Sequence, residues 1–308
     1  FDFLLLHLHT PHNLFYIVIY MFGQSITVTF DGISGTLNVF EAVSSLVTDL
    51  MFKIVNDDDF TGIRICTLDS NQVCVIYADF EATVDNLDIG SSVQVCVPAK
   101  LLVSVLKCIK EQNILVFEYP QTDGTQQLII HQYEQENCSI TQKFIIDAID
   151  APLQDELDTE FDYPYCMTIS LSEVREFIVN SGTFGADTLT IGVRRSTKDE
   201  YNVANNLTLS TDGSIKCEKN YYTEHSTEEQ ANDFCIDNTL AMKDQPVGHE
   251  FNNIVCNTFG VKYIKDFLRP LQAIDIRLSM ANEMPIRLAY PISEKSFITL
   301  FITPRNLD

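Results

Sequence analysis

The side chains most able to do chemistry are lysines and arginines that recur on one side of two amphipathic segments. Projected at the helical period, the basic residues of 98–110 and 259–271 stand opposite an apolar arc. They are Lys100, Lys107 and Lys110 in the first segment and Lys262, Lys265 and Arg269 in the second. Ammonium and guanidinium groups are the groups that contact phosphate oxygens, so such stripes indicate sequence-independent binding to nucleic acid.

The overall charge argues the other way. The 308 residues include 20 Lys and Arg against 43 Asp and Glu, which gives a formal charge of −23 and is typical of proteins that avoid DNA. Each basic stripe, taken alone, is compatible with an ordinary solvated helix face. The same stripe on corresponding helices of two chain halves favours function, because a surface that is positive in one place confines DNA to that place.

No pattern predicts catalysis, a cofactor or a metal site. The chain lacks a phosphate-binding loop, a G-x-S-x-G elbow and an H-E-x-x-H pair. The carboxylates Asp57–Asp59 are interpreted as a solvated turn. Nine cysteines, an odd number without any C-x-x-C pair, indicate small buried hydrophobic residues in a reducing compartment.

Residues 1–20 differ from the rest of the chain and are interpreted as an extension of doubtful origin before Met21. Their two apolar runs are too short to cross a bilayer, and they lack the basic start and small-residue cleavage site of a signal peptide. His7, His9 and His12 are spaced like a metal-binding tail, a hypothesis that nothing else supports.

The remaining chain alternates short strands with two helices in each half, which predicts an α+β fold built from a duplicated unit. The expected helices are 36–50, 98–110, 172–181 and 259–271. The expected strands are 63–68, 73–77, 93–97, 114–119, 127–132, 189–193, 206–210, 214–218, 275–280, 286–291 and 296–302.

An acidic segment, Ile146–Pro164, separates the halves. It carries seven carboxylates, with Leu153, Leu157 and Phe161 among them. A solvated linker is the simplest interpretation, but long loops in compact chains are often functional, and apolar side chains need a surface to pack on. The expected domains are therefore residues 21–145 and 165–308, joined by this loop at 146–164.

Several stretches resemble, in the same order, the proliferating-cell-nuclear-antigen (PCNA) family of DNA sliding clamps. Thr67–Val75 is similar to the family's x-M-D-x-S-H-V segment, and Val105–Cys108 is similar to its I-L-K-C helix. The family's ending is matched by Phe259–Leu268, Ile276–Met280, Met284–Tyr290 and Leu300–Pro304. The resemblance spans residues 21–308.

The resemblance implies a DNA-clamp fold of two similar domains, each with two helices on the inner face and antiparallel sheets outside. It implies a non-enzymatic processivity factor for DNA polymerase, closed as a head-to-tail homotrimer around double-stranded DNA. Contact with the phosphates would be sequence-independent and sensitive to salt. The residues facing DNA would be Lys100, Lys107, Lys110, Arg175, Lys262, Lys265 and Arg269.

The resemblance also implies a partner pocket beneath the connecting loop. Its clients would be the replicative DNA polymerase, the clamp loader and other replication and repair proteins that carry a PIP-box, in the nucleus or at a viral replication site. The matching positions are Leu68, Gln72, Val73, Val75, Leu153, Leu157, Phe161, Pro285, Phe301, Thr303 and Pro304.

Subunit contacts are expected to pair an edge strand at Gln127–Gln132 with a strand of the neighbour within Leu207–Cys217. The residues assigned to this interface are Gln127, Leu128, Ile129, Ile130, Leu207, Leu209, Ile215 and Cys217.

Some positions depart from the family pattern. Segment 36–50 has no basic residue, Gln72 replaces a His, Phe301 a Tyr and Thr303 an Ala. Two other roles stay open: a subunit of a hetero-trimeric checkpoint clamp, and a monomeric viral processivity factor. The second would need a stronger basic surface than a chain of charge −23 offers.

Overall fold

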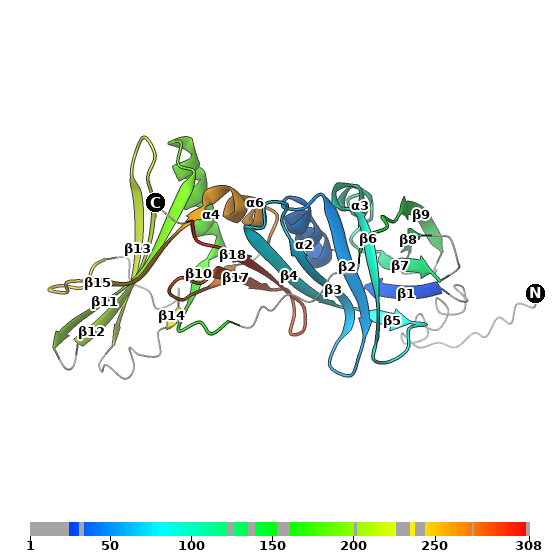
Figure 1. Cartoon of the computed structure of the whole chain (residues 1–308), viewed down its shortest axis with the longest axis horizontal. Coiled ribbons are helices and arrows are strands. Elements are labelled where there is room, and N and C mark those ends of the chain that lie inside the picture. Colours follow the sequence, from blue (N-terminus) through cyan, green and yellow to red (C-terminus); the bar gives the residue numbers. More distant parts are fainter. Residues whose placement is uncertain are drawn as a thin grey trace, which may run out of the picture. The chain divides into compact units, whose positions relative to one another are not determined.

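The computed structural model describes residues 25–30, 34–121, 126–134, 139–152, 161–199, 202–225, 235–237, 244–272 and 274–305. The extension at 1–20, the turn at 122–125, and Leu153 and Leu157 of the connecting loop lie outside this set. The described chain divides into two compact units, both of which contain strands and helices (Figure 1).

The first unit contains a five-stranded antiparallel sheet with the order β5-β1-β7-β8-β9. Its strands are β1 (Ser25–Phe30), β5 (Thr83–Asp85), β7 (Ile114–Pro120), β8 (Gln127–Tyr133) and β9 (Ile140–Asp147). The same unit holds β2 (Asp49–Asn56), which pairs antiparallel with β3 (Thr61–Leu68) and with β6 (Ser91–Pro98). Helix α3 (Ala99–Leu106) follows β6 and packs against β6 and β9.

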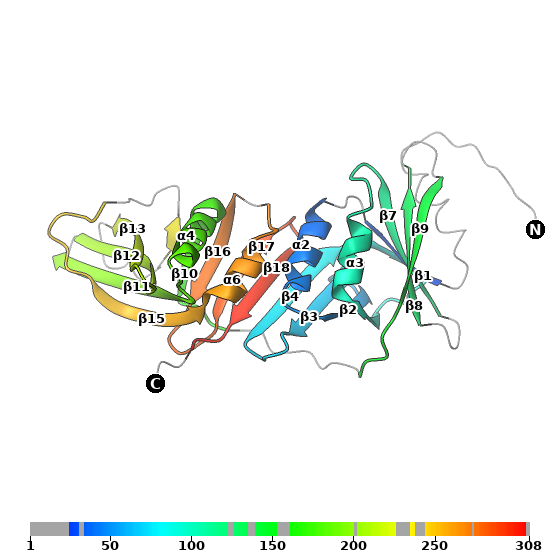
Figure 2. The ribbon, with the colours of Figure 1, turned by 90° about the horizontal axis from the view of Figure 1, so that it is seen from above.

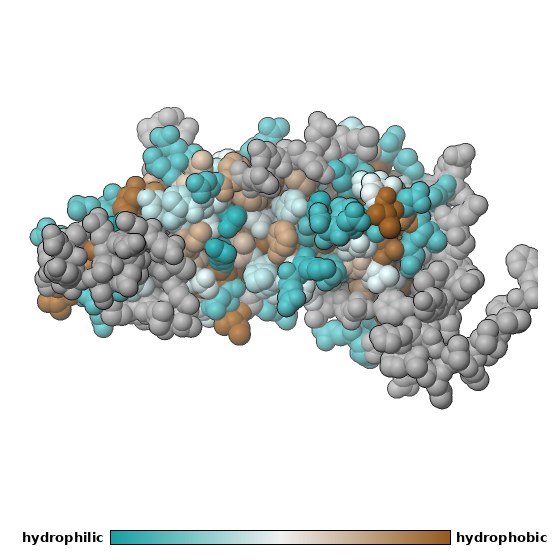
Figure 3. All heavy atoms as spheres, turned by 90° about the horizontal axis from the view of Figure 1, so that it is seen from below, coloured by the Kyte–Doolittle hydropathy of each residue, from teal (hydrophilic) through white to brown (hydrophobic). Residues whose placement is uncertain are grey.

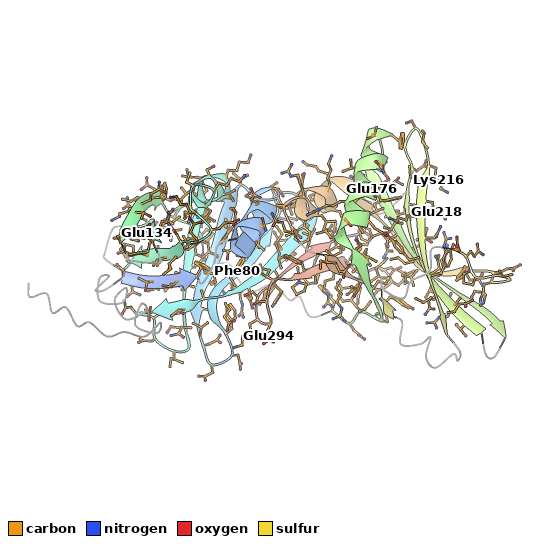
Figure 4. All side chains as sticks on the ribbon, turned by 180° about the vertical axis from the view of Figure 1, so that it is seen from behind. Phe80, Glu134, Glu176, Lys216, Glu218 and Glu294 are labelled. Carbon is orange, nitrogen blue, oxygen red and sulfur yellow. The ribbon has the colours of Figure 1, made fainter. Side chains whose placement is uncertain are left out.

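A glycine allows two strands of this unit to approach closely. Gly62 on β3 has φ of 149°, and a Cβ atom there would lie 1.9 Å from the backbone oxygen of Phe80. Phe80 belongs to β4 (Cys74–Glu81) and is labelled in Figure 4. Only glycine fits this combination of backbone angle and contact.

The second unit contains a four-stranded antiparallel sheet, β13-β12-β11-β15, together with β14, β10, β16, β17, β18 and the first part of β4, which follow one another in that order in a second sheet. The strands not yet given are β10 (Tyr165–Ser170), β11 (Thr188–Asp199), β12 (Asn202–Thr211), β13 (Cys217–His225), β14 (Cys235–Asp237), β15 (Asn252–Gly260), β16 (Asp275–Met280), β17 (Ile286–Pro291) and β18 (Phe297–Ile302). The pairing of β10 with β14 is parallel, whereas β10 with β16, β16 with β17 and β17 with β18 are antiparallel.

Helices α4 (Leu171–Thr183) and α6 (Val261–Leu268) lie side by side in this unit and pack on its strands (Figure 2). Most of α2 (Ser34–Ser44) also belongs to it. With four helices among the described residues and almost entirely antiparallel sheets, the predicted α+β class is confirmed.

The prediction that Gln127–Gln132 forms an edge strand is wrong. These residues belong to β8, which is hydrogen-bonded to β7 on one side and to β9 on the other. Leu128, Ile129 and Ile130 are buried in the sheet interior. The edges of this sheet are β5 and β9, and the sequence pattern predicts neither strand.

The strand within Leu207–Cys217, expected to pair with the neighbouring subunit, is also not a single strand in the structure. Leu207 and Leu209 are buried on β12, which is paired with β11 and with β13. Ile215 lies in the connection before β13, and the strand begins only at Cys217, not at Ser214 as predicted. The edges of the four-stranded sheet are therefore β13 and β15.

Candidate nucleic-acid and partner-binding surfaces

Helix α3 exposes lysines to solvent because its opposite side packs in the hydrophobic core. Pro98 caps the helix with extended backbone angles, and Ala99, Leu102, Val103 and Leu106 are buried. Lys100, Lys107 and Lys110 are exposed, the last two just beyond the end of the helix. Leu101 is 48% exposed, although the helical period predicts it in the apolar arc opposite the lysines.

Helix α6 repeats this arrangement in the second unit. Gly260 precedes the helix, and Val261, Ile264, Phe267 and Leu268 are its buried residues. The basic stripe of α6 is exposed along its whole length and comprises Lys262, Lys265 and Arg269. The burial of one face thus fixes the opposite, cationic face toward solvent.

Arg175 on α4 has a different environment from these residues. Its guanidinium donates hydrogen bonds to the backbone oxygen of Leu268, from Nε at 2.9 Å and also from Nη2, and to the oxygen of Leu271. Burial lowers the pKa of Arg175. The side chain satisfies carbonyl groups at the end of α6, which have no partner within the helix.

The remaining charged side chains of α4 are acidic. Glu173 forms an ion pair with Lys219 at 3.2 Å and accepts a hydrogen bond from the hydroxyl of Tyr221 at 3.0 Å. Glu176 is exposed and lies in the same region as Lys216 and Glu218 (Figure 4). The exposed basic charge of the described helices is therefore carried by α3 and α6.

A tight turn between β3 and β4 brings several predicted pocket residues together. The buried carboxylate of Asp69 accepts backbone hydrogen bonds from Asn71, Val73 and Cys74 at 3.1, 2.6 and 2.8 Å. Burial by itself would raise the pKa of Asp69, but these hydrogen bonds hold it below its usual value. Within the turn, Gln72 is exposed and has the left-handed φ of 56°.

The turn is joined to the end of β18. The backbone oxygen of Val73 accepts hydrogen bonds from the backbone nitrogen of Thr303 at 3.0 Å and from its hydroxyl at 3.1 Å. Three predicted pocket residues, Gln72, Val73 and Thr303, are thereby brought to one place. Leu68, before the turn, and Pro304, after Thr303, are both half-buried.

An aromatic cluster lies beside this junction. Tyr163, Ala281 and Phe301 are its buried members. Its half-buried members are Val75, Tyr77, Phe161, Cys166 and Met284. The ring of Phe161 is 5.7 Å from that of Phe301 and 6.1 Å from that of Tyr163. Leu300 and Ile302, which alternate with Phe301 on β18, point to the opposite face of the sheet.

Tyr163 anchors the end of the connecting loop to this cluster. Its hydroxyl donates to the backbone oxygen of Pro285 at 2.8 Å, and the guanidinium of Arg287 lies 5.2 Å from the centre of its ring. Burial raises the pKa of Tyr163 to about 12, against the opposing effect of the Arg287 charge. Seen from the side away from the helices, hydrophobic residues form separate patches among hydrophilic ones (Figure 3).

The sequence therefore located part of this surface. Val75, Phe161 and Phe301 meet in the aromatic cluster, and Pro285 contacts it through Tyr163. Tyr163, Tyr77 and Met284 were missed. The alternation of Phe161, Tyr163 and Tyr165 at the end of an acidic loop was the signal for Tyr163, whereas Tyr77 and Met284 were hidden inside ordinary strand and turn patterns.

Exposed apolar residues lie on the edge strand β9 and beside the edge strand β13. On β9, Ile140 and Ile145 are 43% and 55% exposed. Ile215, next to β13, and Val179 on α4 are 52% and 55% exposed. Ser214 is bonded to the backbone oxygen of Phe184 after α4, so Ile215 and the end of α4 belong to one surface.

The described residues offer neither a metal-binding group nor a membrane-spanning helix. Among them, no group of three or more His, Cys, Asp and Glu side chains has a metal-binding arrangement. Asp57 accepts hydrogen bonds from the backbone of Asp59 and Phe60, which closes the turn between β2 and β3. No helix in the described part of the chain is long and apolar enough to span a membrane.

Comparison with known proteins gives one consistent result. No family model matches the chain. It is 21% identical to the proliferating cell nuclear antigen of Caenorhabditis elegans over 272 residues, which cover 88% of this chain and 93% of that protein.

Solved structures agree with this match. The PCNA of Entamoeba histolytica superposes with a TM-score of 0.66 at 18% identity, covering 91% of this chain and 98% of that one. The PCNA of Thermococcus kodakaraensis superposes with a TM-score of 0.64 at 16% identity, covering 91% of this chain and 100% of that one. A chain of the PCNA2–PCNA3 complex of Sulfolobus tokodaii superposes with a TM-score of 0.62 at 14% identity, covering 91% of this chain and 99% of that one. The resemblance to the PCNA family is thus confirmed, and the chain has the sliding-clamp fold as a divergent relative of these proteins.

Proposed function

We propose that this protein is a DNA sliding clamp, a non-enzymatic ring that holds DNA polymerase on duplex DNA. The observation that carries the proposal is the pair of exposed basic stripes on α3 and α6, in a chain of charge −23 that has the clamp fold. Six of the 20 basic residues stand on these two stripes. A cationic bore inside an anionic body attracts DNA to the bore and repels it elsewhere.

The contact with DNA would be loose. Exposed lysines that meet phosphates without reading bases give sequence-independent binding, which allows the protein to slide. Retention would come from encirclement rather than affinity. Arg175, whose guanidinium is occupied by the carbonyls of α6, would act by holding that helix in position rather than by touching phosphate.

A topological experiment tests encirclement. The protein is loaded by a clamp loader with ATP onto nicked circular DNA, and its retention is followed before and after the circle is cut once. A clamp stays on the closed circle and leaves after linearisation, because it slides off the free ends. Equal retention on both forms would contradict encirclement, and a variant with Lys262→Gln and Lys265→Gln is the control for the electrostatic part.

We further propose that the aromatic cluster and the Val73–Thr303 junction form the docking site for client proteins. Half-buried aromatic and aliphatic side chains next to a long acidic loop suit a short helical turn with apolar anchors, as carried by PIP-box proteins. The clients would be the replicative polymerase, the clamp loader and repair proteins. Peptide titration against wild-type protein and Phe301→Ala tests this docking.

The proposed homotrimer would close through β9 of one subunit and β13 of the next. Both are edge strands of their sheets, and pairing them would satisfy edge backbone groups and cover Ile140, Ile145 and Ile215. The strands expected from the sequence, β8 and β12, are paired on both sides and leave no edge for a neighbour. The site of action would be the nucleus, or a viral replication site.

A further inference from the structure

The strongest unexplained feature near the aromatic cluster is the cation Arg287. It lies on β17, opposite Ser279 of β16 and Phe301 of β18 in the strand register. Its side chain is half-buried, and its Nε atom is buried without a hydrogen-bond partner. Within the described residues, Arg287 makes no ion pair, and the contact it does make is with the ring of Tyr163.

The neighbours of Arg287 on the same sheet face offer no negative charge. Cys166, Ser279, Ala289, Thr299 and Phe301, in register on that face, are neutral, and Arg277, which pairs with Ala289, is a second cation. The exposed carboxylates Asp162 and Glu283 belong to nearby turns, yet neither pairs with Arg287 in the described structure. Among the described residues of this chain of charge −23, Arg287 therefore lies beside an apolar cluster without a paired carboxylate.

We propose that Arg287 selects clients that carry a carboxylate next to their aromatic anchor. This rests on the proposed docking role of the aromatic cluster. An anchor seated on Phe301 and Tyr163 would cover Arg287 and remove its remaining contact with water. Burial of an unpaired charge is costly, so a client without an anion at that place is penalised, and one with a carboxylate gains a charge-assisted hydrogen bond.

The geometry favours arginine for this task. The planar guanidinium of arginine carries its N–H groups in a rigid fork that matches the two oxygens of a carboxylate, and that of Arg287 lies over the Tyr163 ring. The Tyr163 hydroxyl is fixed on Pro285, so the ring stays in place and the fork is preorganised. The client recognised here would therefore combine an aromatic anchor with an adjacent Asp or Glu.

The test uses two synthetic peptides with the same aromatic and aliphatic anchors. One carries Glu beside the aromatic anchor and the other carries Gln. Binding to the full-length wild-type protein is measured by calorimetry at low and high salt. The Glu peptide should bind about tenfold more tightly than the Gln peptide, and the advantage should shrink at high salt.

Variants then locate the effect. Arg287→Gln should remove the preference for Glu, whereas Arg287→Lys should keep part of it. Arg277→Gln is the matched control, because Arg277 stands on the same sheet face two residues from Ser279 and is exposed. This control should retain the full preference.

The outcomes separate the two proposals. If both peptides bind wild-type protein equally, or if the preference for Glu survives in Arg287→Gln, the selective role of Arg287 is wrong while docking stands. If neither peptide binds, the docking role of the cluster fails, and the role of Arg287 fails with it. Because the first comparison uses wild-type protein, misfolding of a variant cannot account for its result.

Discussion

The Nε atom of Arg175 on α4 donates a hydrogen bond to the backbone oxygen of Leu268, at a distance of 2.9 Å, where α6 ends. A second donor of the same guanidinium reaches Leu271. A cation at a helix C-terminus also interacts favourably with the partial negative charge of that end. One side chain thereby fixes the end of the helix that carries Lys262, Lys265 and Arg269.

Replacement of Arg175 should cost stability rather than DNA binding. Arg175→Gln should lower the free energy of unfolding by about 1–3 kcal/mol, since a charged donor to buried carbonyls is removed. Urea denaturation at unchanged m-value measures this. Glu176→Gln, the exposed neighbouring residue, is the control and should have little effect. An unchanged stability with a weaker salt dependence of DNA binding would instead mean that Arg175 contacts phosphate.

The basic stripe of α6 should set the salt dependence of DNA binding. In the double variant Lys262→Gln with Lys265→Gln, the slope of log K against log salt should fall by roughly one for each phosphate that the helix no longer neutralises. The matched control, Arg277→Gln with Lys295→Gln, removes the same charge from exposed residues outside the helices. Equal slopes for the two variants would show that net charge, not the stripe, attracts DNA.

The Asp69 carboxylate should make the turn that carries Gln72 and Val73 sensitive to acid. Its pKa is lower in the folded protein than in the unfolded chain, so the unfolded state takes up the proton more readily. The stabilisation is complete above the unfolded-state pKa of about 4 and is lost as the pH falls through the folded value. Asp69→Asn should therefore cost about 1–3 kcal/mol at neutral pH and progressively less below pH 4.

Chemical denaturation at several pH values tests this prediction. The exposed Asp59→Asn, in the connection between β2 and β3, is the control and should follow the wild-type curve. A deficit of Asp69→Asn that stays constant into acid would mean that the hydrogen bonds to Asn71, Val73 and Cys74 do not depend on the charge of Asp69.

The edge strand β9 should hold the assembly together. Ile145 is 55% exposed there, so Ile145→Lys should leave the folded subunit intact but place a charge where a neighbour would bury an apolar side chain. The expected result is a shift to smaller species in sedimentation. Ile89→Lys, at a residue 74% exposed in the connection before β6, should leave the assembly unchanged. Dissociation by both variants would indicate a general effect of charge.

Local periodicity predicted the strands at 114–119 and 127–132 and the amphipathic faces of α3 and α6, because these patterns are set by neighbouring residues. These two strands pair with each other, but β1 and β9, which pair with them on their other sides, could not be predicted in the same way. The β9 strand was missed since Thr141, Gln142 and Lys143 interrupt its alternation, and pairing with β8 is what defines it. For that reason the sequence pattern assigned the sheet edge to β8 instead of β9.

The end of α2 shows how tertiary pairing overrides a local pattern. Val47 and Leu50 continue the apolar arc of the segment 36–50, so a single helix was expected. In the structure the helix ends at Ser44, and Leu50 belongs to β2, where it pairs with Val97 of β6. The burial of Leu50 was correctly anticipated, but the strand that buries it depends on residues far away in the chain.

In the candidate sites too, some residues could be predicted from local sequence patterns and others depend on tertiary packing. Exposed lysines on α3 and α6 follow from the helical period, whereas the engagement of Arg175 depends on how α4 packs against α6. Phe301 and Val75 were found through the family resemblance. Arg287 was not, because its significance lies in what surrounds it: a ring on one side and neutral residues in register.

The most direct test of a self-assembling clamp is the solution mass by light scattering over a dilution series. We predict a stable species of three times the 34.9 kDa chain mass that persists on dilution. A single chain mass at every concentration would contradict the homotrimer and favour a monomeric processivity factor or a subunit that needs different partners to close a ring.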